Sequence, residues 1–209
     1  AYLVNNIEFW NLSLYVDQNV LVPRPETEIL VQKVLETFDK KKIRVLDLGT
    51  GSGAIGLSLA KERANWEVVC SDLSYEALKV TSKNMIRNSL CVSLVNSNWL
   101  SAFKNEYFDV IVSNPPYINP SDPRVYSDGL KFEPKQALIS DSGGLHDIER
   151  IVKETSEILN NTGYLFIEHG YDQSDFVVSI FETYGFSQIR TFKDLNGDDR
   201  VCLGKLNRC

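Results

Sequence analysis

Residues 114–117, Asn-Pro-Pro-Tyr, place an amide, a bare carbonyl and an aromatic ring directly after the strand-like run 110–112. Proline fixes its own φ and donates no N–H, so this segment cannot continue a strand or begin a helix. The side-chain oxygen of Asn114 and the carbonyl of Pro115 are two acceptors that match the two hydrogens of a planar –NH2 group. Tyr117 can lie against the flat face of that group. Taken alone, the segment is equally compatible with a stiff loop.

Such a rim suits the transfer of an electrophilic group to nitrogen. A planar –NH2 is a poor nucleophile because its lone pair is delocalised. Holding both hydrogens aims the lone pair at the electrophile and builds electron density on nitrogen as the bond forms. A sulfonium methyl group is reactive enough that no strong base is needed. We therefore expect Asn114, Pro115 and Tyr117 to be the catalytic residues, and we assign His146 and His169 no such role.

A glycine-rich segment, residues 47–53 (Asp-Leu-Gly-Thr-Gly-Ser-Gly), joins a strand pattern to a helix pattern. Residues 51–56 match the fingerprint of dinucleotide-binding loops, so a nicotinamide or flavin dinucleotide has to be considered. The Asp47 carboxylate argues against it, because a carboxylate would repel a pyrophosphate and attract an ammonium group. S-adenosylmethionine carries an ammonium and a carboxylate on its methionine end, and we expect it as the cofactor.

Two further strand ends carry polar or aromatic residues. Asp72 lies nineteen residues beyond Gly53, where an acidic residue accepts hydrogen bonds from ribose hydroxyls; a helix cap is the other interpretation. Asn98 and Trp99 suit a planar heterocycle through hydrogen bonding and stacking, although Trp99 is equally compatible with a core position.

The elements that must position these residues alternate between strand and helix patterns. A short hairpin or strand lead-in is expected over 1–22, and a helix follows Pro25 and runs to about residue 39. The other expected helices are 53–62, 74–88, 144–160 and 173–184, and the expected strands are 43–48, 67–71, 92–95, 108–113, 163–168, 186–192 and 200–205, with an irregular stretch over 118–143. This order predicts an α/β fold with a doubly wound, mainly parallel, seven-stranded Rossmann-like sheet and an antiparallel C-terminal edge. Such sheets bind ligands at the carboxyl ends of their strands.

Composition limits the classes of function. The 209 residues are 43% hydrophobic and 24% charged, with a net charge of −6, so one sizeable domain is expected and no basic surface for nucleic acid. No apolar run reaches the roughly 18 residues of a membrane span, and no signal peptide is present. The scattered cysteines favour a reducing compartment over disulfides or zinc; they are Cys70, Cys91, Cys202 and Cys209. We expect a cytoplasmic monomer without a metal, with an organellar location left open.

Further short motifs follow in a definite order along the chain. They are Phe9-Trp10, residues 23–28 (Pro-Arg-Pro-Glu-Thr-Glu), 113–118 (Ser-Asn-Pro-Pro-Tyr-Ile), 132–134 (Phe-Glu-Pro), 137–138 (Ala-Leu), 141–144 (Asp-Ser-Gly-Gly) and 168–170 (Glu-His-Gly). Together with the glycine-rich segment, they resemble the HemK/PrmC family of release factor N5-glutamine methyltransferases, which are class I S-adenosylmethionine-dependent enzymes. The resemblance covers nearly the whole chain.

The resemblance implies methylation of the glutamine amide in the Gly-Gly-Gln motif of a class I peptide chain release factor, with S-adenosylhomocysteine as the second product. It implies a cofactor site at Asp47, Gly49, Thr50, Gly51, Ser52, Gly53, Asp72, Leu73, Asn98, Trp99 and Asn114. It implies a substrate site at Arg24, Glu26, Asn114, Pro115, Pro116, Tyr117 and Glu133. The Arg-Pro-Glu-Thr segment is expected to fold over the active-site entrance.

The resemblance also implies a division of the chain. Residues 1–28 are expected to hold the hairpin and the Arg-Pro-Glu-Thr segment, and residues 29–209 the methyltransferase domain, without the N-terminal helical domain that the family usually carries. Two positions depart from the family pattern: Asn98 stands where Asp is frequent, and Lys131 where Arg is frequent. A neutral acceptor and a single ammonium should bind less strongly than those residues.

Other functions stay open at this point. The Asn-Pro-Pro-Tyr rim also fits an amino-methyltransferase acting on adenine N6 or guanine N2 of nucleic acid, which the net charge of −6 disfavours. It equally fits a glutamine methyltransferase acting on a ribosomal protein. A dinucleotide-binding oxidoreductase and a non-catalytic binding module remain as alternatives from other classes.

Overall fold

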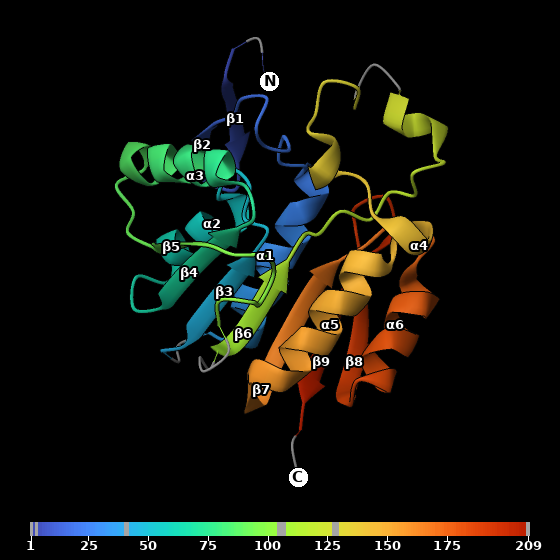
Figure 1. The fold of residues 1–209 in the computed structure, drawn as a ribbon. Coiled ribbons are helices and arrows are strands. Elements are labelled where there is room, and N and C mark those ends of the chain that lie inside the picture. Colours follow the sequence, from blue (N-terminus) through green and yellow to red (C-terminus); the bar gives the residue numbers. More distant parts are fainter. Residues whose placement is uncertain (1, 3, 40–41, 104–107, 127–129, 208–209) are drawn as a thin grey trace.

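Within residues 2, 4–39, 42–103, 108–126 and 130–207, which the computed structural model describes, a seven-stranded sheet forms the centre of the molecule (Figure 1). Its strand order is β5-β4-β3-β6-β7-β9-β8. The strands are β3 (Arg44–Leu48), β4 (Glu67–Asp72), β5 (Ser93–Asn96), β6 (Phe108–Ser113), β7 (Leu159–Glu168), β8 (Phe186–Lys193) and β9 (Asp199–Leu206). The predicted doubly wound α/β fold is confirmed.

Strand directions explain where the polar strand ends meet. β3, β4, β5, β6 and β7 pair in parallel, so their carboxyl ends lie at one edge of the sheet. β9 pairs antiparallel with both β7 and β8, so the last strand is inserted and β8 forms the edge. β7 begins at Leu159, earlier than predicted, and its register against β6 shifts between Phe108 and Val110.

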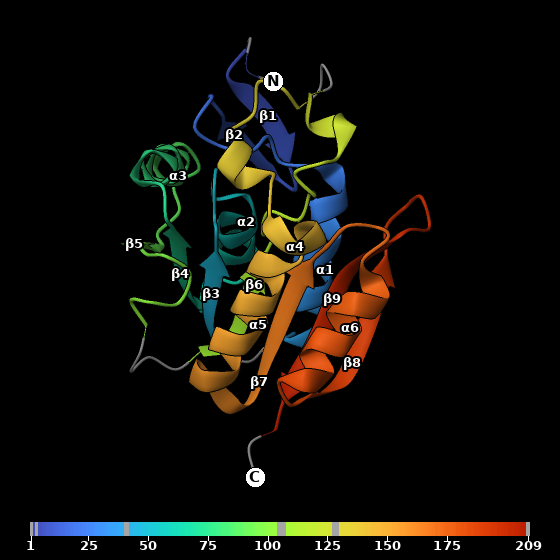
Figure 2. The ribbon, with the colours of Figure 1, turned by 45° about the vertical axis from the view of Figure 1, so that its right-hand side comes forward.

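Helices cover both faces of the sheet (Figure 2). Successive strand residues point to opposite faces, and accordingly Val45 and Val110 pack in one core cluster while Leu46 and Ile111 pack in another. The first cluster is covered by α1 (Glu28–Thr37), α2 (Ala54–Glu62) and the end of α3 (Tyr75–Arg87), and the second by α5 (His146–Ile158) and α6 (Ser174–Thr183). Each face of the sheet is therefore covered by its own set of helices.

The stretch predicted as irregular, 118–143, contains short ordered pieces. They are the 3-10 turns η2 (Pro123–Tyr126) and η3 (Lys135–Ala137) and the start of the one-turn helix α4 (Asp141–Gly144). An isolated parallel bridge joins Ile118 to Ile139, so the two ends of the stretch lie side by side. The predicted helix 144–160 is α5, shorter at both ends.

The N-terminal hairpin consists of β1 (Asn6–Phe9) and β2 (Leu12–Tyr15), and a coil then leads to η1 (Pro25–Thr27). The buried amide of Asn84 on α3 fixes the hairpin, because its oxygen accepts from the Tyr15 N–H at 2.7 Å and its nitrogen donates to the Tyr15 carbonyl at 2.9 Å. The same nitrogen donates to the Ser52 carbonyl at 2.8 Å. One side chain thus joins the hairpin to the glycine-rich loop.

Some predictions fall outside the described residues: positions 1, 3 and 127–129 and Cys209. Among the described cysteines, Cys70 and Cys202 are buried and free, and Cys91 is exposed and free. Within the same residues, no group of three or more histidine, cysteine, aspartate or glutamate side chains is arranged to hold a metal ion. None of the helices in the described part of the chain has the length and apolar character needed to span a membrane.

Candidate active site

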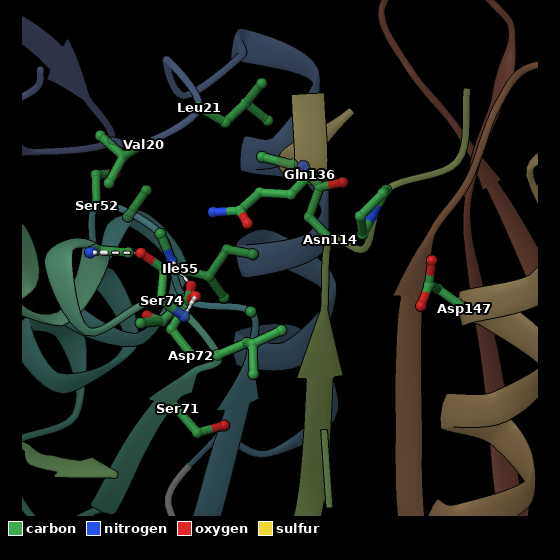
Figure 3. A pocket seen from close by; sticks show the side chains of 18 of the residues that line it. Val20, Leu21, Ser52, Ile55, Ser71, Asp72, Ser74, Asn114, Gln136 and Asp147 are labelled. Carbon is green, nitrogen blue, oxygen red and sulfur yellow. Dashed lines mark hydrogen bonds between the residues drawn. The ribbon is translucent and has the colours of Figure 1, made fainter. Parts of the chain in front are cut away.

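A cavity of about 320 Å³ opens at the carboxyl ends of β3, β4, β5 and β6. Figure 3 shows Asp72 and Ser74 on its left and Asn114 on its right, with Val20 and Leu21 at the top. Ten residues of the predicted cofactor and substrate sites line it: Gly49, Thr50, Gly51, Ser52, Asp72, Leu73, Asn98, Trp99, Asn114 and Pro116. The structure therefore brings the four informative strand ends to one cavity.

The glycine-rich loop has a backbone shape that other residues rarely adopt. Gly49, Gly51 and Gly53 have φ values of +68°, +56° and +86°, in the left-handed region. A Cβ on Gly51 would meet no atom within 4 Å, whereas one on Gly53 would lie 2.8 Å from Leu57 and Thr81. Gly51 thus opens to the cavity, and Gly53 does not line it but allows α2 to begin in close contact with α3.

Asp47 lies behind the loop, not in the cavity wall. Its neighbours Leu46 and Leu48 point to the opposite face of the sheet, so the carboxylate points toward α2. There Oδ2 accepts from the Thr50 hydroxyl at 2.6 Å and from the Gly56 N–H at 2.9 Å, and Oδ1 has no hydrogen-bond partner among the described residues. Burial raises the pKa of Asp47 to about 6. Its observed contacts support the loop from beneath.

Asp72 faces the cavity with an oriented carboxylate. Oδ2 accepts from the Gly51 N–H at 2.9 Å and Oδ1 from the Ser74 N–H at 2.8 Å. The helix cap of α3 is Ser74, whose hydroxyl accepts from the Ala77 N–H, so the helix-cap interpretation of Asp72 is wrong. Burial raises the pKa of Asp72. Each carboxylate oxygen keeps a further lone pair for a ligand hydroxyl.

Trp99 forms a fixed wall of the cavity. Its indole N–H donates to Asp147 Oδ1 at 3.1 Å, and the Ser140 hydroxyl holds the other oxygen of Asp147 at 2.7 Å. The ring lies against the loop so closely that a Cβ on Gly49 would be 3.3 Å from it. Asn98, the preceding residue, is exposed at the rim. Sequence patterns gave no reason to select Asp147, which lies 48 positions beyond Trp99.

A second cavity, of about 550 Å³, adjoins the first. Arg24, Pro115 and Tyr117 line it, while Asn114, Leu21 and Ala137 line both cavities. The Asn114 amide nitrogen donates to Thr27 Oγ1 at 3.2 Å, and its Oδ1 receives no hydrogen bond from the described residues. An unused acceptor therefore lies at the junction, where a group from one cavity can meet a group from the other.

Tyr117 is held by its hydroxyl and by its backbone. The hydroxyl donates to Glu168 Oε1 at 3.1 Å, and the Tyr117 carbonyl accepts from Gln173 Nε2 at 3.0 Å. Burial and the Glu168 charge raise the pKa of Tyr117 above its ordinary value. Burial also raises the pKa of Glu168 to about 7. The phenol is thus a neutral donor, and its ring is fixed beside the junction.

His169 has no geometry for proton transfer in either cavity. Its ring is buried and lines neither one. Its Nδ1 lies 2.8 Å from the Gly170 carbonyl oxygen, while Nε2 has no hydrogen-bond partner among the described residues. Burial lowers the pKa of His169, so the imidazole is neutral near pH 7.

The predicted substrate residues outside the rim divide into two kinds. Arg24 lines the second cavity and forms an ion pair with Glu133. Glu133 is buried, also accepts from the Val22 N–H at 3.3 Å, and lines neither cavity. It therefore fixes the Arg-Pro-Glu-Thr segment from inside. Glu26 is half-buried and lines neither cavity.

Sequence comparison finds close relatives along almost the whole chain. The model of the family described as "Methyltransferase small domain" matches residues 25–128. A protein of Buchnera aphidicola subsp. Schizaphis graminum (strain Sg), named release factor glutamine methyltransferase, is 45% identical over 206 residues, which are 98% of this chain and 74% of that protein. The Escherichia coli (strain K12) protein of the same name is 37% identical over 209 residues, with 98% and 74% covered.

Solved structures share the fold. The protein-(glutamine-N5) methyltransferase (release factor-specific) from Alicyclobacillus acidocaldarius matches with a TM-score of 0.55 and 28% identity, covering 93% of this chain and all of that one. The T. thermophilus 16S rRNA N2 G1207 methyltransferase, solved in complex with AdoMet and guanosine, matches with a TM-score of 0.71 and 19% identity, covering 97% and 50%. At that identity the second likeness concerns the fold alone.

Proposed function

Since this chain belongs to the family of release factor glutamine methyltransferases, we propose that it transfers the methyl group of S-adenosylmethionine to the side-chain amide nitrogen (N5) of a release factor glutamine. The observation that carries the proposal is the position of Asn114. Its unused Oδ1 lies where the two cavities meet. A methyl donor in the first cavity would there face an amide held in the second.

The residues of the first cavity fit S-adenosylmethionine. The Asp72 carboxylate suits ribose hydroxyls, the Trp99 ring and the exposed Asn98 suit the adenine, and the open side of the loop at Gly51 allows close approach of the methionine part. The orphaned Oδ1 of Asp47, behind the loop, favours a cationic group nearby. When bound, S-adenosylmethionine supplies an electrophilic methyl group on a sulfonium.

The residues of the rim prepare the amide for transfer. Asn114 Oδ1 and the Pro115 carbonyl accept its two hydrogens, so its lone pair points toward the first cavity and gains electron density as the bond forms. The ring of Tyr117, anchored through Glu168, forms the wall that keeps the amide plane fixed. The methylated nitrogen gives up one proton, which leaves to water in the second cavity.

The remaining finer predictions concern the partner and the setting. Arg24 and Pro115 in the second cavity are proposed to contact a peptide segment of the release factor. Action as a monomer in the cytoplasm, and a functional division between residues 1–28 and 29–209, stay predictions. Light scattering of the purified chain measures its mass in solution and so tests whether it is a monomer.

The decisive experiment is mass spectrometry of a release factor after incubation with the purified chain and S-adenosylmethionine carrying a labelled methyl group. We expect one added methyl on the glutamine of Gly-Gly-Gln and none on a factor with that glutamine replaced by alanine. Ribosomal proteins, ribosomal RNA and DNA serve as competing substrates. Label in those molecules, with an unmodified factor, would refute the proposal in favour of the corresponding alternative.

Ligand-induced stabilisation tests the cofactor independently of the protein substrate. A ligand that binds only the folded state raises the midpoint of thermal unfolding, by an amount that grows with its concentration over its Kd. S-adenosylhomocysteine should raise the midpoint and NADH should not. The opposite pattern would favour a dinucleotide-binding protein.

A further inference from the structure

The orientation of the Asn114 amide is not set by its own segment. An amide rotated by half a turn keeps its shape, so only hydrogen bonds decide whether oxygen or nitrogen faces the substrate. The one hydrogen bond of this amide within the described residues goes from Nδ2 to Thr27 Oγ1, at 3.2 Å and across 87 positions of sequence. Thr27 is buried at the end of η1. The direction of this bond leaves Oδ1 for the substrate.

A hydroxyl both donates and accepts, so Thr27 keeps the amide in this orientation only while its own hydrogen is directed elsewhere. The buried carboxylate of Glu168 lies close enough that interaction with the Thr27 hydroxyl lowers the pKa of Glu168 against the effect of burial. Glu168 Oε1 already accepts from Tyr117. Oε2 is buried and has no hydrogen-bond partner among the described residues, so it keeps its capacity to accept.

We propose that Glu168 is a positioning residue for transfer: it accepts the hydrogen of Thr27, Thr27 accepts an amide hydrogen of Asn114, and Asn114 thereby presents Oδ1 to the substrate. This inference rests on the proposed function. Glu168 lines neither cavity and acts only through the two hydroxyls. Because Tyr117 donates to the same carboxylate, one buried group orients both the acceptor and the ring wall of the rim.

The charge of Glu168 decides the direction of this chain of hydrogen bonds. A protonated Glu168 becomes a donor to Thr27, which then donates to Asn114 and turns its amide nitrogen toward the substrate. Burial raises the pKa of Glu168, the hydroxyls of Thr27 and Tyr117 and the charge of Arg200 on β9 lower it, and Glu26 on η1 raises it, with a net value of about 7. Turnover should therefore rise as the pH rises through about 7, whereas a purely structural role for Glu168 predicts no such limb.

Kinetics of Thr27→Val test the relay, because valine keeps the shape of threonine and removes the hydroxyl. We expect kcat to fall about tenfold, in line with the loss of one oriented hydrogen bond, with little change in KM for S-adenosylmethionine. Thr27→Ser should restore most of the turnover. The matched control is Thr155→Val, because Thr155 is buried in α5 and its hydroxyl has no hydrogen-bond partner in the part of the chain that the structure describes. Wild-type turnover of Thr27→Val would overturn the inference while leaving the proposed function intact.

A second measurement does not depend on methyl transfer. NMR titration of the Glu168 side-chain carboxyl carbon, assigned through its bonded neighbours, reports the pKa of that group. Removing a donor to the charged form raises a carboxyl pKa, so Thr27→Val should raise the pKa of Glu168, and Thr155→Val should leave it unchanged. An unchanged pKa in Thr27→Val would disprove the link. If the wild-type chain failed to methylate any release factor, the proposed function would fall and this titration would still decide the link.

Discussion

Asn114 is half-buried at the junction of the two cavities and makes one side-chain hydrogen bond among the described residues, to Thr27. Asn114→Ala removes that bond and the acceptor, but no part of the core. We expect turnover to fall about a hundredfold, as for loss of one preorganised electrostatic contact, and the free energy of unfolding to fall by only about 1 kcal/mol. Steady-state kinetics and urea unfolding measure the two quantities. A large loss of unfolding free energy alongside the loss of turnover would mean that Asn114 has a structural role. The control is Asn207→Ala, because Asn207 is exposed.

Asp72 offers the most direct test of the cofactor site. Asp72→Asn keeps the shape but replaces a charged acceptor with a neutral one and presents an N–H to one of the two donors, Gly51 or Ser74. We expect the Kd for S-adenosylhomocysteine to rise at least about tenfold, since charge-assisted hydrogen bonds are roughly twice as strong as neutral ones. Isothermal titration calorimetry measures it. Asp175→Asn, an exposed aspartate on α6, should bind as the wild type does.

Between elements, α3 couples the hairpin to the glycine-rich loop through Asn84. Asn84→Ala leaves the Tyr15 N–H and the Tyr15 and Ser52 carbonyls without their partner, and each buried unsatisfied group costs about 1–3 kcal/mol. We expect both a lower unfolding midpoint and weaker binding of S-adenosylhomocysteine. The control is Asn88→Ala on the same helix, because Asn88 bonds to the hairpin at Ser13 and not to the loop. Equal loss of ligand binding in both variants would contradict the coupling.

Local sequence was sufficient to predict the helices and strands and the strand ends that line the cavity. The run 110–112, the glycines of the loop and Asp72 each show their role within a few residues, because strand ends and left-handed turns are local properties. The inserted position of β9 was not predictable in this way, because it depends on pairing between distant segments. Local sequence also did not show that the Asp47 side chain points toward α2 and accepts from the Gly56 N–H.

The functional residues that sequence missed depend on contacts across long separations. Thr27 meets Asn114 across 87 positions, and Asp147 meets Trp99 across 48. Glu133 was selected from the family motif as a substrate residue, yet its observed partner is Arg24, 109 positions away. The periodicity and residue spacing within a single segment cannot predict contacts between residues so far apart in the sequence. They become visible only when the sheet has brought the strand ends together.

For the whole molecule, two buried carboxylates set a pH dependence of stability. The pKa of Asp47 is raised from 3.8 to about 6 and that of Glu168 from 4.5 to about 7. Between about pH 4 and about pH 7 the folded state therefore binds more protons than the unfolded state, so the free energy of unfolding falls as the pH rises. The stabilising contribution of these two groups is complete below about pH 4 and is lost by about pH 7. Urea unfolding should show a smaller loss over this range for Glu168→Gln than for the wild type. Identical pH dependences would refute this.

The insertion of β9 between β7 and β8 has a consequence for synthesis. A growing chain can pair β3, β4, β5, β6 and β7 as they emerge, but β8 has no neighbour in the sheet until residues 199–206 follow. Until then the free side of β7 is an open edge, the kind of surface that recruits other strands into aggregates. A premature stop after β8 would therefore remove the strand that closes the sheet, although every residue lining the first cavity had already been made.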